Sequence, residues 1–413
     1  MVQRPTGEMI LNKPTGVLAA TAAPPFAPLP RPEIGALGAS RIREIANAAM
    51  GRTDVAAFWF GESDAPTPAF IRDAAAQALA SGETFYTQNL GLPALRDALS
   101  SYLTRLHGAP IGADRVGVVG SGVSGLMLSA QMLASPGDRI VVVTPIWPNI
   151  TELPRILGAE VVRVPLGIVD GAWRLDLDRL LKALTPDTRA VIINSPNNPT
   201  GWTIDPESLA AVFAHCRRLG IWVITDDAYE RLVFDGTGKA PSLLPTADLE
   251  DRLISVNTFS KAWSMTGFRV GWMVAPPPFI AELAKVIEYN TSCVPKFSQL
   301  GAVAALDPVA GEAAIADLVD GLTVSRKMLV DGLKRHNAIE VPDAAGAMYA
   351  FFRIRGREDD MALARDLLAI TGLGLAPGSS FGPEGAGWLR WCFAARREKI
   401  ADGLARLDRF LAA

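Results

Sequence analysis

The chain has 413 residues, of which 49% are hydrophobic and 20% are charged, and its formal net charge is −3 at pH 7. This composition is ordinary for a folded globular protein and supplies enough apolar material for a large core. The length predicts roughly two or three domains. The near-neutral charge balance gives no support for a nucleic-acid partner, which usually requires a strongly basic patch. No long apolar run escapes charges or prolines, so no transmembrane helix is predicted.

The N-terminal residues 1–32 are rich in proline, alanine and threonine and show no helical or strand periodicity. Their apolar stretch at 16–23 could mimic a signal peptide, but it is short and five prolines follow it closely. The three cysteines are scattered without a C-x-x-C pair, and the histidines are not spaced as metal ligands. We therefore predict an extended or flexible N-terminal arm over 1–32, a cytoplasmic location and no metal site.

The first half of the chain alternates predicted helices with predicted strands. Ser40 stands where it can cap the first helix. A glycine-rich turn, Gly120–Gly125, joins a strand to a helix, and such a turn exposes backbone N–H groups that favour an anion. Helices are predicted over 40–50, 68–80 and 92–107 and from the turn to about 134; strands are predicted over 55–60, 116–119, 139–144 and 159–164.

The same glycine-rich turn matches the G-x-G-x-x-G pattern of dinucleotide-binding proteins. That alternative needs an acidic residue about twenty positions later, at the end of the next strand. Thr144 and Pro145 stand there instead. An NAD-dependent dehydrogenase is therefore a weaker interpretation of this turn.

Polar and aromatic residues follow the next predicted strands where each one ends. Trp147 and Asn198 come after two such strands, and Asp226 and Tyr229 come after a third. Ligands bind at the carboxyl ends of strands in open parallel sheets. A carboxylate such as Asp226 would hold a pyridine nitrogen protonated, because opposite charges stabilise each other. Further strands are predicted over 190–193, 220–225, 253–256, 270–274 and 347–352, and helices over 177–184, 207–218, 279–290, 297–305 and 309–337.

The segment Asn257–Gly271 joins two apolar strands and carries hydroxyl residues, Lys261 and Arg269. Hydroxyls and an arginine suit a phosphate, and a lysine amine condenses with an aldehyde to form a Schiff base. Pyridoxal phosphate carries both groups. This segment therefore favours a pyridoxal phosphate site.

The sequence pattern of the segment, S-K-x-x-x-M-T-G-x-R-x-G, resembles the cofactor-lysine motif of class I/II aminotransferases, the aspartate aminotransferase family of fold type I. The resemblance extends from about residue 40 to about residue 400. Its other motifs are Y-x-x-x-x-G-x-P-x-L-R from 86, N-x-P-x-N-P-T-G from 194, D-x-x-Y from 226, P-G-x-x-F from 377 and R-x-x-F-A from 390.

The resemblance implies a role for each matching residue. Lys261 would form the Schiff base and move the substrate proton, Asp226 would face the ring nitrogen, and Arg390 would bind the substrate α-carboxylate. Asn198 and Tyr229 would face the ring oxygen. Other cofactor contacts are expected from Ser121, Gly122, Val123, Trp147, Thr258, Ser260 and Arg269 and, across a dimer interface, from Tyr86; Gly61 and Asn198 are also expected at the substrate.

The implied fold is α/β, with a mostly parallel seven-stranded sheet between helices in a large domain and a smaller α+β domain. The large domain should span 63–305, and the small domain should combine 33–62 with 306–413. The implied function is transfer of an amino group from an L-amino acid to a 2-oxo acid by a homodimer. A C–S lyase, a decarboxylase and a non-catalytic regulatory protein are the alternatives.

The segment Gly61–Pro66 resembles the family's G-E-P-D-F-x-T-P loop, with Ser63 and Ala65 in place of a proline and an aromatic residue. We expect these two residues to line the mouth of the site together with Trp59 and Phe60. That lining would favour an uncharged or aromatic amino donor.

Overall fold

The computed structural model describes residues 30–412, and the chain divides into two compact units, residues 1–37 and residues 38–413. Within the first unit, helix α1 (Pro32–Gly35) has four residues. Most of the predicted arm over 1–32 lies outside the described residues. The arm stays a prediction, and its last residue, Pro32, is also the first residue of α1, because proline fixes a backbone angle suited to a first helical turn.

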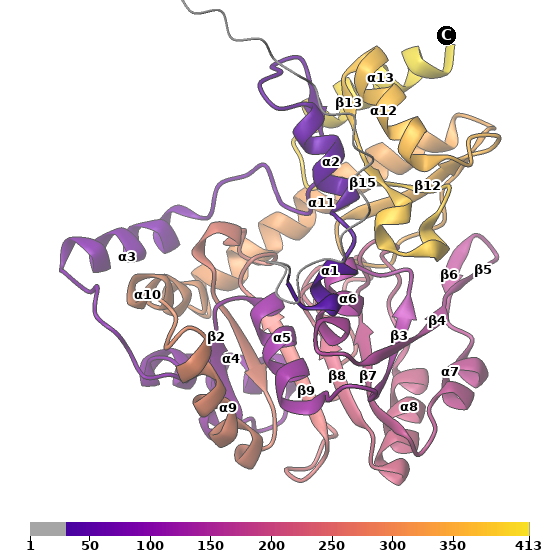
Figure 1. Cartoon of the computed structure of the whole chain (residues 1–413). Helices are drawn as coiled ribbons and strands as arrows, with labels where there is room; N and C mark the ends of the chain where they lie inside the picture. Colours follow the sequence, from indigo (N-terminus) through magenta and orange to yellow (C-terminus); the bar gives the residue numbers. More distant parts are fainter. Residues whose placement is uncertain (1–29, 413) are drawn as a thin grey trace, which may run out of the picture. The chain divides into compact units, whose positions relative to one another are not determined.

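A seven-stranded sheet organises the second unit (Figure 1). Only β10 runs antiparallel to its two neighbours in this sheet; the other pairings are parallel. The predicted α/β fold with a mostly parallel seven-stranded sheet is therefore confirmed. The strands lie in the order β2 (Val116–Val119), β10 (Gly271–Val274), β9 (Leu253–Thr258), β8 (Trp222–Asp226), β7 (Thr188–Asn194), β3 (Arg139–Thr144) and β4 (Glu160–Pro165).

Both faces of this sheet are buried, as its continuous apolar strands require. Successive side chains of a strand point to opposite faces. In β3, Ile140 and Val142 belong to one core cluster, and Val141 and Val143 belong to the other. The first cluster includes side chains of α5 (Gly122–Leu133), α6 (Pro148–Ile156) and α9 (Pro277–Asn290), and the second includes side chains of α4 (Pro93–His107), α7 (Leu177–Ala183) and α8 (Pro206–Leu219).

A second, antiparallel sheet lies in the C-terminal part of the chain, together with three helices (Figure 1). Its order is β11 (Ile339–Glu340), β12 (Tyr349–Ile354), β15 (Leu389–Cys392) and β14 (Ala376–Pro377). The helices are α11 (Ala310–Lys334), α12 (Asp360–Thr371) and α13 (Arg397–Ala412). This α+β layer matches the predicted smaller lobe.

The segment before the large sheet joins this C-terminal part. Ser40 caps α2 (Arg41–Ala48) as predicted, and its hydroxyl accepts a hydrogen bond from the Arg43 backbone nitrogen at 3.3 Å. The strand predicted over 55–60 is shorter: β1 (Ala56–Ala57) pairs in parallel with β13 (Leu373–Gly374). The backbone then turns toward β15, where the Phe58 oxygen accepts a hydrogen bond from the Cys392 nitrogen.

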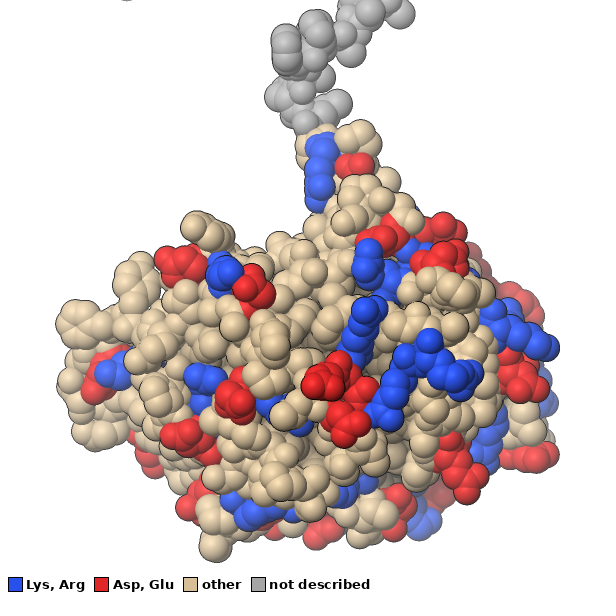
Figure 2. All heavy atoms as spheres, turned by 90° about the horizontal axis from the view of Figure 1, so that it is seen from below, with Lys and Arg blue, Asp and Glu red and all other residues tan. Residues whose placement is uncertain are grey.

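The remaining elements lie between these layers and at their edges. Helices α3 and α10 pack side by side (Figure 1). None of the described helices is both long enough and apolar enough to cross a membrane. Figure 2 shows positive and negative side chains intermixed over one face. The elements not yet given are α3 (Ala69–Ala80), α10 (Lys296–Ala305), β5 (Gly167–Val169), β6 (Ala172–Arg174) and 3₁₀ turns at Ala113–Arg115, Thr266–Phe268, Gly378–Phe381 and Pro383–Gly385.

Candidate active site

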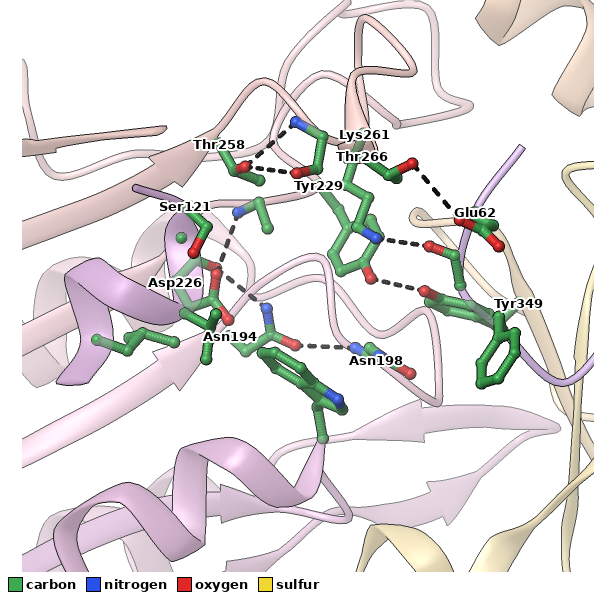
Figure 3. A pocket seen from close by; sticks show the side chains of 18 of the residues that line it. Glu62, Ser121, Asn194, Asn198, Asp226, Tyr229, Thr258, Lys261, Thr266 and Tyr349 are labelled. Carbon is green, nitrogen blue, oxygen red and sulfur yellow. Dashed lines mark hydrogen bonds between the residues drawn. The ribbon is translucent and has the colours of Figure 1, made fainter. Parts of the chain in front are cut away.

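A cavity of about 450 Å³ opens at the carboxyl ends of the parallel strands of the large sheet (Figure 3). Side chains from β12, β15 and α2 complete its wall. It brings together almost every residue predicted for the site, from positions more than three hundred residues apart in the chain. These residues are Gly61, Ser121, Gly122, Val123, Trp147, Asn198, Asp226, Tyr229, Thr258, Ser260, Lys261, Arg269 and Arg390.

Tyr86 is the predicted site residue that does not line this cavity. Its side chain is 87% exposed on the surface of the single chain. The prediction placed it in the neighbouring subunit's site, so its position within one chain leaves that role a prediction.

Lys261 lies in the connection between β9 and β10, and its side chain points into the cavity. Its Nζ donates a hydrogen bond to the Gly61 carbonyl oxygen at 2.5 Å. Burial of the amine lowers the pKa of Lys261 to about 8, and the positive charges of Arg390 and Arg269 act in the same direction. A larger fraction of this amine is therefore uncharged near neutral pH than is usual for lysine, and only the uncharged amine is a nucleophile.

The chain comes close to Lys261 at residue 61 because that residue is glycine. A Cβ atom added to Gly61 would lie 2.1 Å from the Tyr349 hydroxyl oxygen. No side chain fits in that space, so glycine lets the carbonyl group of residue 61 reach the lysine.

Asp226 ends β8, in the middle of the large sheet, and its side chain is buried. Its carboxylate accepts a hydrogen bond from the Ala228 nitrogen at 3.3 Å, and it belongs to none of the ion pairs found among residues 30–412. Burial raises the pKa of Asp226 to about 7. A buried carboxylate without a cation is costly, so this site suits a ligand that brings a positive charge.

Arg390 lies on β15 with its guanidinium group buried between two aromatic rings, those of Tyr349 and Phe381. Its Nη1 donates to Asn198 Oδ1 at 2.9 Å and its Nη2 donates to the Trp59 carbonyl oxygen. Its buried Nε has no partner within the described part of the chain. Because arginine only donates, Arg390 fixes which end of the Asn198 amide is oxygen, and its remaining N–H groups are left as donors for an anion.

Hydroxyl and amide groups gather at the other end of the cavity, where α5 begins. Ser121 caps this helix, and its hydroxyl accepts from the Ser124 nitrogen at 3.1 Å. The Thr258 hydroxyl donates to Ser260 Oγ at 2.9 Å, and Arg269 donates to the Thr266 carbonyl oxygen at 2.7 Å. A helix N-terminus with hydroxyls and a guanidinium group nearby is the arrangement that binds a phosphate.

The close packing of this phosphate-binding arrangement depends on a glycine. A Cβ atom added to Gly271 would lie 2.6 Å from the Asn257 carbonyl oxygen and 2.9 Å from the Ser121 carbonyl carbon. A larger residue on β10 would therefore push the turn before α5 away from the end of β9.

Trp147 precedes α6 and lines the cavity wall, and its backbone nitrogen donates to the Asn198 carbonyl oxygen at 2.9 Å. This bond ties the loop after β3 to the loop after β7. The indole is thus in the cavity as predicted, while its stacking on a cofactor ring stays a prediction.

Asn194 and Tyr349 are among the residues of this site that were missed in the sequence. Asn194 donates from Nδ2 to the Asp226 carbonyl oxygen at 3.1 Å and accepts from the Asn198 nitrogen at 2.8 Å, so it joins the ends of β7 and β8. Its place as the first residue of the N-x-P-x-N-P-T-G motif was the available signal. Tyr349 lines the cavity from β12, and no motif quoted for the family included it.

The mouth of the cavity differs from the prediction. Trp59 and Phe60 line it, but Ser63 and Ala65 do not; they line neighbouring hollows beside α3 and α11. The reason is that the backbone turns after Glu62, where the Asp64 nitrogen donates to the Ala394 carbonyl oxygen. The other side of the mouth comes from α2, which the sequence analysis did not place there.

Comparison with known proteins shows to which family a chain with this cavity belongs. The family model described as aminotransferase class I and II matches residues 55–407. The chain belongs to the class I and II aminotransferase family. It is 31% identical to an aspartate aminotransferase of Pyrococcus horikoshii, over 90% of this chain and 94% of that protein. It is also 32% identical to a valine–pyruvate aminotransferase of Mycobacterium tuberculosis, over 85% and 89% of the two proteins.

The solved structures agree with the sequence relatives. An aspartate aminotransferase of Thermus thermophilus, a single mutant, superimposes with a TM-score of 0.86 at 28% identity and covers 92% of this chain and 99% of its own. The fold is therefore that of the fold type I aminotransferases, as predicted. The family depends on pyridoxal phosphate, and the cavity fits it: a buried carboxylate without a cation, an amine of lowered pKa and a phosphate-binding helix end face the same space.

Proposed function

We propose that this aminotransferase holds its cofactor and substrate with the residues that line the cavity at the strand ends. Bound pyridoxal phosphate supplies an aldehyde that condenses with amines and a ring that withdraws electrons from the substrate carbon. Lys261 then acts as the general base that takes the proton from the substrate Cα and as the general acid that delivers it to a carbon of the cofactor. The observation that carries this proposal is that a lysine amine of lowered pKa and a buried carboxylate that belongs to no ion pair line the same cavity.

The other residues of the cavity bind and orient the cofactor and the substrate. Asp226 holds a proton on the ring nitrogen, and Asn198 and Tyr229 donate to the ring oxygen. Trp147 covers the ring face. The N-terminus of α5 at Ser121, Gly122 and Val123, with Thr258, Ser260 and Arg269, holds the phosphate, while Arg390 and the backbone at Gly61 hold the substrate.

Replacing Arg390 with alanine should lower kcat/KM for every amino donor, chiefly by raising KM. Two charge-assisted hydrogen bonds to a carboxylate are worth about 1.5–3 kcal/mol each, so the loss should be about a hundredfold or more. Steady-state kinetics would measure it. Arg353→Ala is the matched control, because Arg353 pairs with Glu340 outside the cavity. An unchanged KM in Arg390→Ala would remove the proposed role.

We propose that the preferred amino donor has an uncharged or aromatic side chain. Trp59, Phe60, Ile42 and Leu126 give the cavity apolar walls, and the Arg43 guanidinium lies 5.7 Å from the centre of the Phe60 ring. The relatives named above are an aspartate aminotransferase and a valine–pyruvate aminotransferase. Membership of the family therefore does not decide between an acidic and an apolar amino donor. Rates with a panel of single amino acids test the choice, and a strong preference for aspartate would refute it.

We also propose a homodimer. Tyr86 and its neighbour Phe85 are largely exposed, and so is Tyr289. The Thr87 nitrogen donates to Cys293 Sγ, which places the segments that carry these rings close together. An exposed group of aromatic side chains is typical of an interface. One chain has a mass of 43.9 kDa, and sedimentation equilibrium should give twice that mass. A mass equal to that of one chain would contradict the proposal.

The cytoplasmic location and the two-domain division, 63–305 and 33–62 with 306–413, remain proposals. The location is supported by the three cysteines, which are free thiols in the structure. The division is supported by the separate four-stranded sheet. Cell fractionation tests the location, and recovery of the protein outside the cytoplasm would count against it. Limited proteolysis tests the domain division, and cleavage within 63–305 only, with none at the proposed boundaries, would count against it.

A further inference from the structure

The hydroxyl groups of Tyr229 and Tyr349 lie 2.6 Å apart at the inner end of the cavity (Figure 3). Both side chains are buried, and burial raises the pKa of each phenol above its usual range, so both stay protonated at neutral pH. Two neutral phenols share one hydrogen bond, in which one donates and the other accepts. The direction of that bond decides which phenol keeps a proton for a ligand.

The surroundings favour Tyr349 as the donor. Within the described residues, each of the two hydroxyls is the only hydrogen-bond partner of the other, but the backbone of Gly61 closes the other side of the Tyr349 hydroxyl. If Tyr229 donated instead, the buried Tyr349 proton would have no acceptor even with a ligand bound, whereas the proton that Tyr229 keeps when Tyr349 donates can be accepted by a ligand oxygen.

We propose that Tyr349 is a positioning residue: its hydroxyl donates to Tyr229 and leaves the Tyr229 proton for the ring oxygen of the cofactor. This inference rests on the proposed function, because it takes Tyr229 as the group that faces that oxygen. A phenol that accepts one hydrogen bond becomes a stronger donor in the next. The Tyr349 hydroxyl therefore strengthens the bond that stabilises negative charge on the ring oxygen.

The ring of Tyr349 has a second, separate task. The Arg390 guanidinium carbon lies 4.5 Å from the centre of this ring and 4.9 Å from the centre of the Phe381 ring. The two rings hold the guanidinium group between them, so the orientation of the carboxylate-binding arginine depends on an aromatic side chain at 349 but not on its hydroxyl.

Two substitutions separate these tasks. Tyr349→Phe removes the hydroxyl and keeps the ring, and Tyr349→Leu removes both. The first readout is the pH at which the visible absorbance of the bound cofactor changes, which is independent of turnover. A donor to the ring oxygen favours the deprotonated form of the chromophore, so loss of the donor should raise this midpoint. Tyr349→Phe should raise it by about half a unit to one unit, with KM within about twofold of wild type.

Tyr349→Leu should show the same shift in the midpoint and, in addition, a KM raised about tenfold, because Arg390 loses one of its two rings. Tyr102→Phe is the control, since the buried Tyr102 hydroxyl is also hydrogen-bonded, to Arg231, but lies outside the cavity lining. It should leave both the midpoint and KM at the wild-type values.

A double variant tests whether Tyr349 acts through Tyr229. Tyr229→Phe combined with Tyr349→Phe should titrate like Tyr229→Phe alone, because the hydroxyl at 349 then has nothing to strengthen. An unchanged midpoint in Tyr349→Phe, or a shift that adds fully to that of Tyr229→Phe, would overturn the inference while leaving the proposed function intact. A protein that takes up no pyridoxal phosphate would overturn both.

Discussion

Replacing Lys261 with alanine should reduce transamination by about 10⁴-fold or more, the largest effect expected for any single substitution in this chain. Among the described residues that line the cavity, this amine is the only group that can both condense with an aldehyde and carry a proton between two carbons. Its lowered pKa of about 8 suits both tasks, because burial has already made protonation of the amine less favourable. Turnover of the wild type and of Lys261→Ala with a good amino donor, measured with excess pyridoxal phosphate, would give the ratio of the two rates.

The control for this experiment is Lys285→Ala, which removes an exposed lysine paired with Glu282 on the surface. It should keep full activity and full cofactor content. Wild-type rates in Lys261→Ala would refute the assignment of the reactive amine, because no other lysine among residues 30–412 lines the cavity.

Replacing Asp226 with asparagine should lower kcat by about a hundred- to a thousand-fold, the second largest effect. Removing one partner of a buried charge pair costs about 3–5 kcal/mol, and each 1.4 kcal/mol is a factor of ten in rate. Asparagine keeps the size of the side chain but cannot hold a proton on the ring nitrogen by its charge. Asp226→Glu should recover part of the loss, since it restores the carboxylate.

The neighbouring acid provides a matched control. Asp227 is also buried at the end of β8, but its carboxylate accepts hydrogen bonds from Thr225 at 2.8 Å and Ser255 at 2.6 Å and does not line the cavity. Asp227→Asn should therefore lower the free energy of unfolding by about 1–3 kcal/mol and leave kcat within about tenfold. Equal losses of kcat in both variants would mean that the effect comes from disturbed packing at the strand end.

The strands and the residues at their ends could be predicted because both depend on local patterns. Buried parallel strands are short apolar runs, and Asp226 follows one of them directly. Whether that carboxylate faced water or the interior could not be predicted, because the sequence also allowed a solvated turn. The structure buries Asp226 and Asp227 alike, one toward the cavity and the other against two hydroxyls.

The residues that were missed or misplaced depend on contacts between distant segments. Tyr349 belongs to a strand of the second sheet and reaches Tyr229 across 120 positions of sequence. Ser63 and Ala65 were expected at the cavity mouth from a loop motif, yet a backbone hydrogen bond from Asp64 to Ala394 turns that loop away. A motif gives the residue types of a site, but the turn that aims each side chain comes from its tertiary partners.

The most direct test is the visible spectrum of the purified protein before and after single amino acids are added. A protein that binds pyridoxal phosphate at Lys261 and transfers amino groups should be yellow, should lose that colour with its amino donors and should regain it with a 2-oxo acid. Colour that persists through this exchange, or changes without being restored by the oxo acid, would contradict amino transfer. A protein that stays colourless with added pyridoxal phosphate would contradict the cofactor site itself.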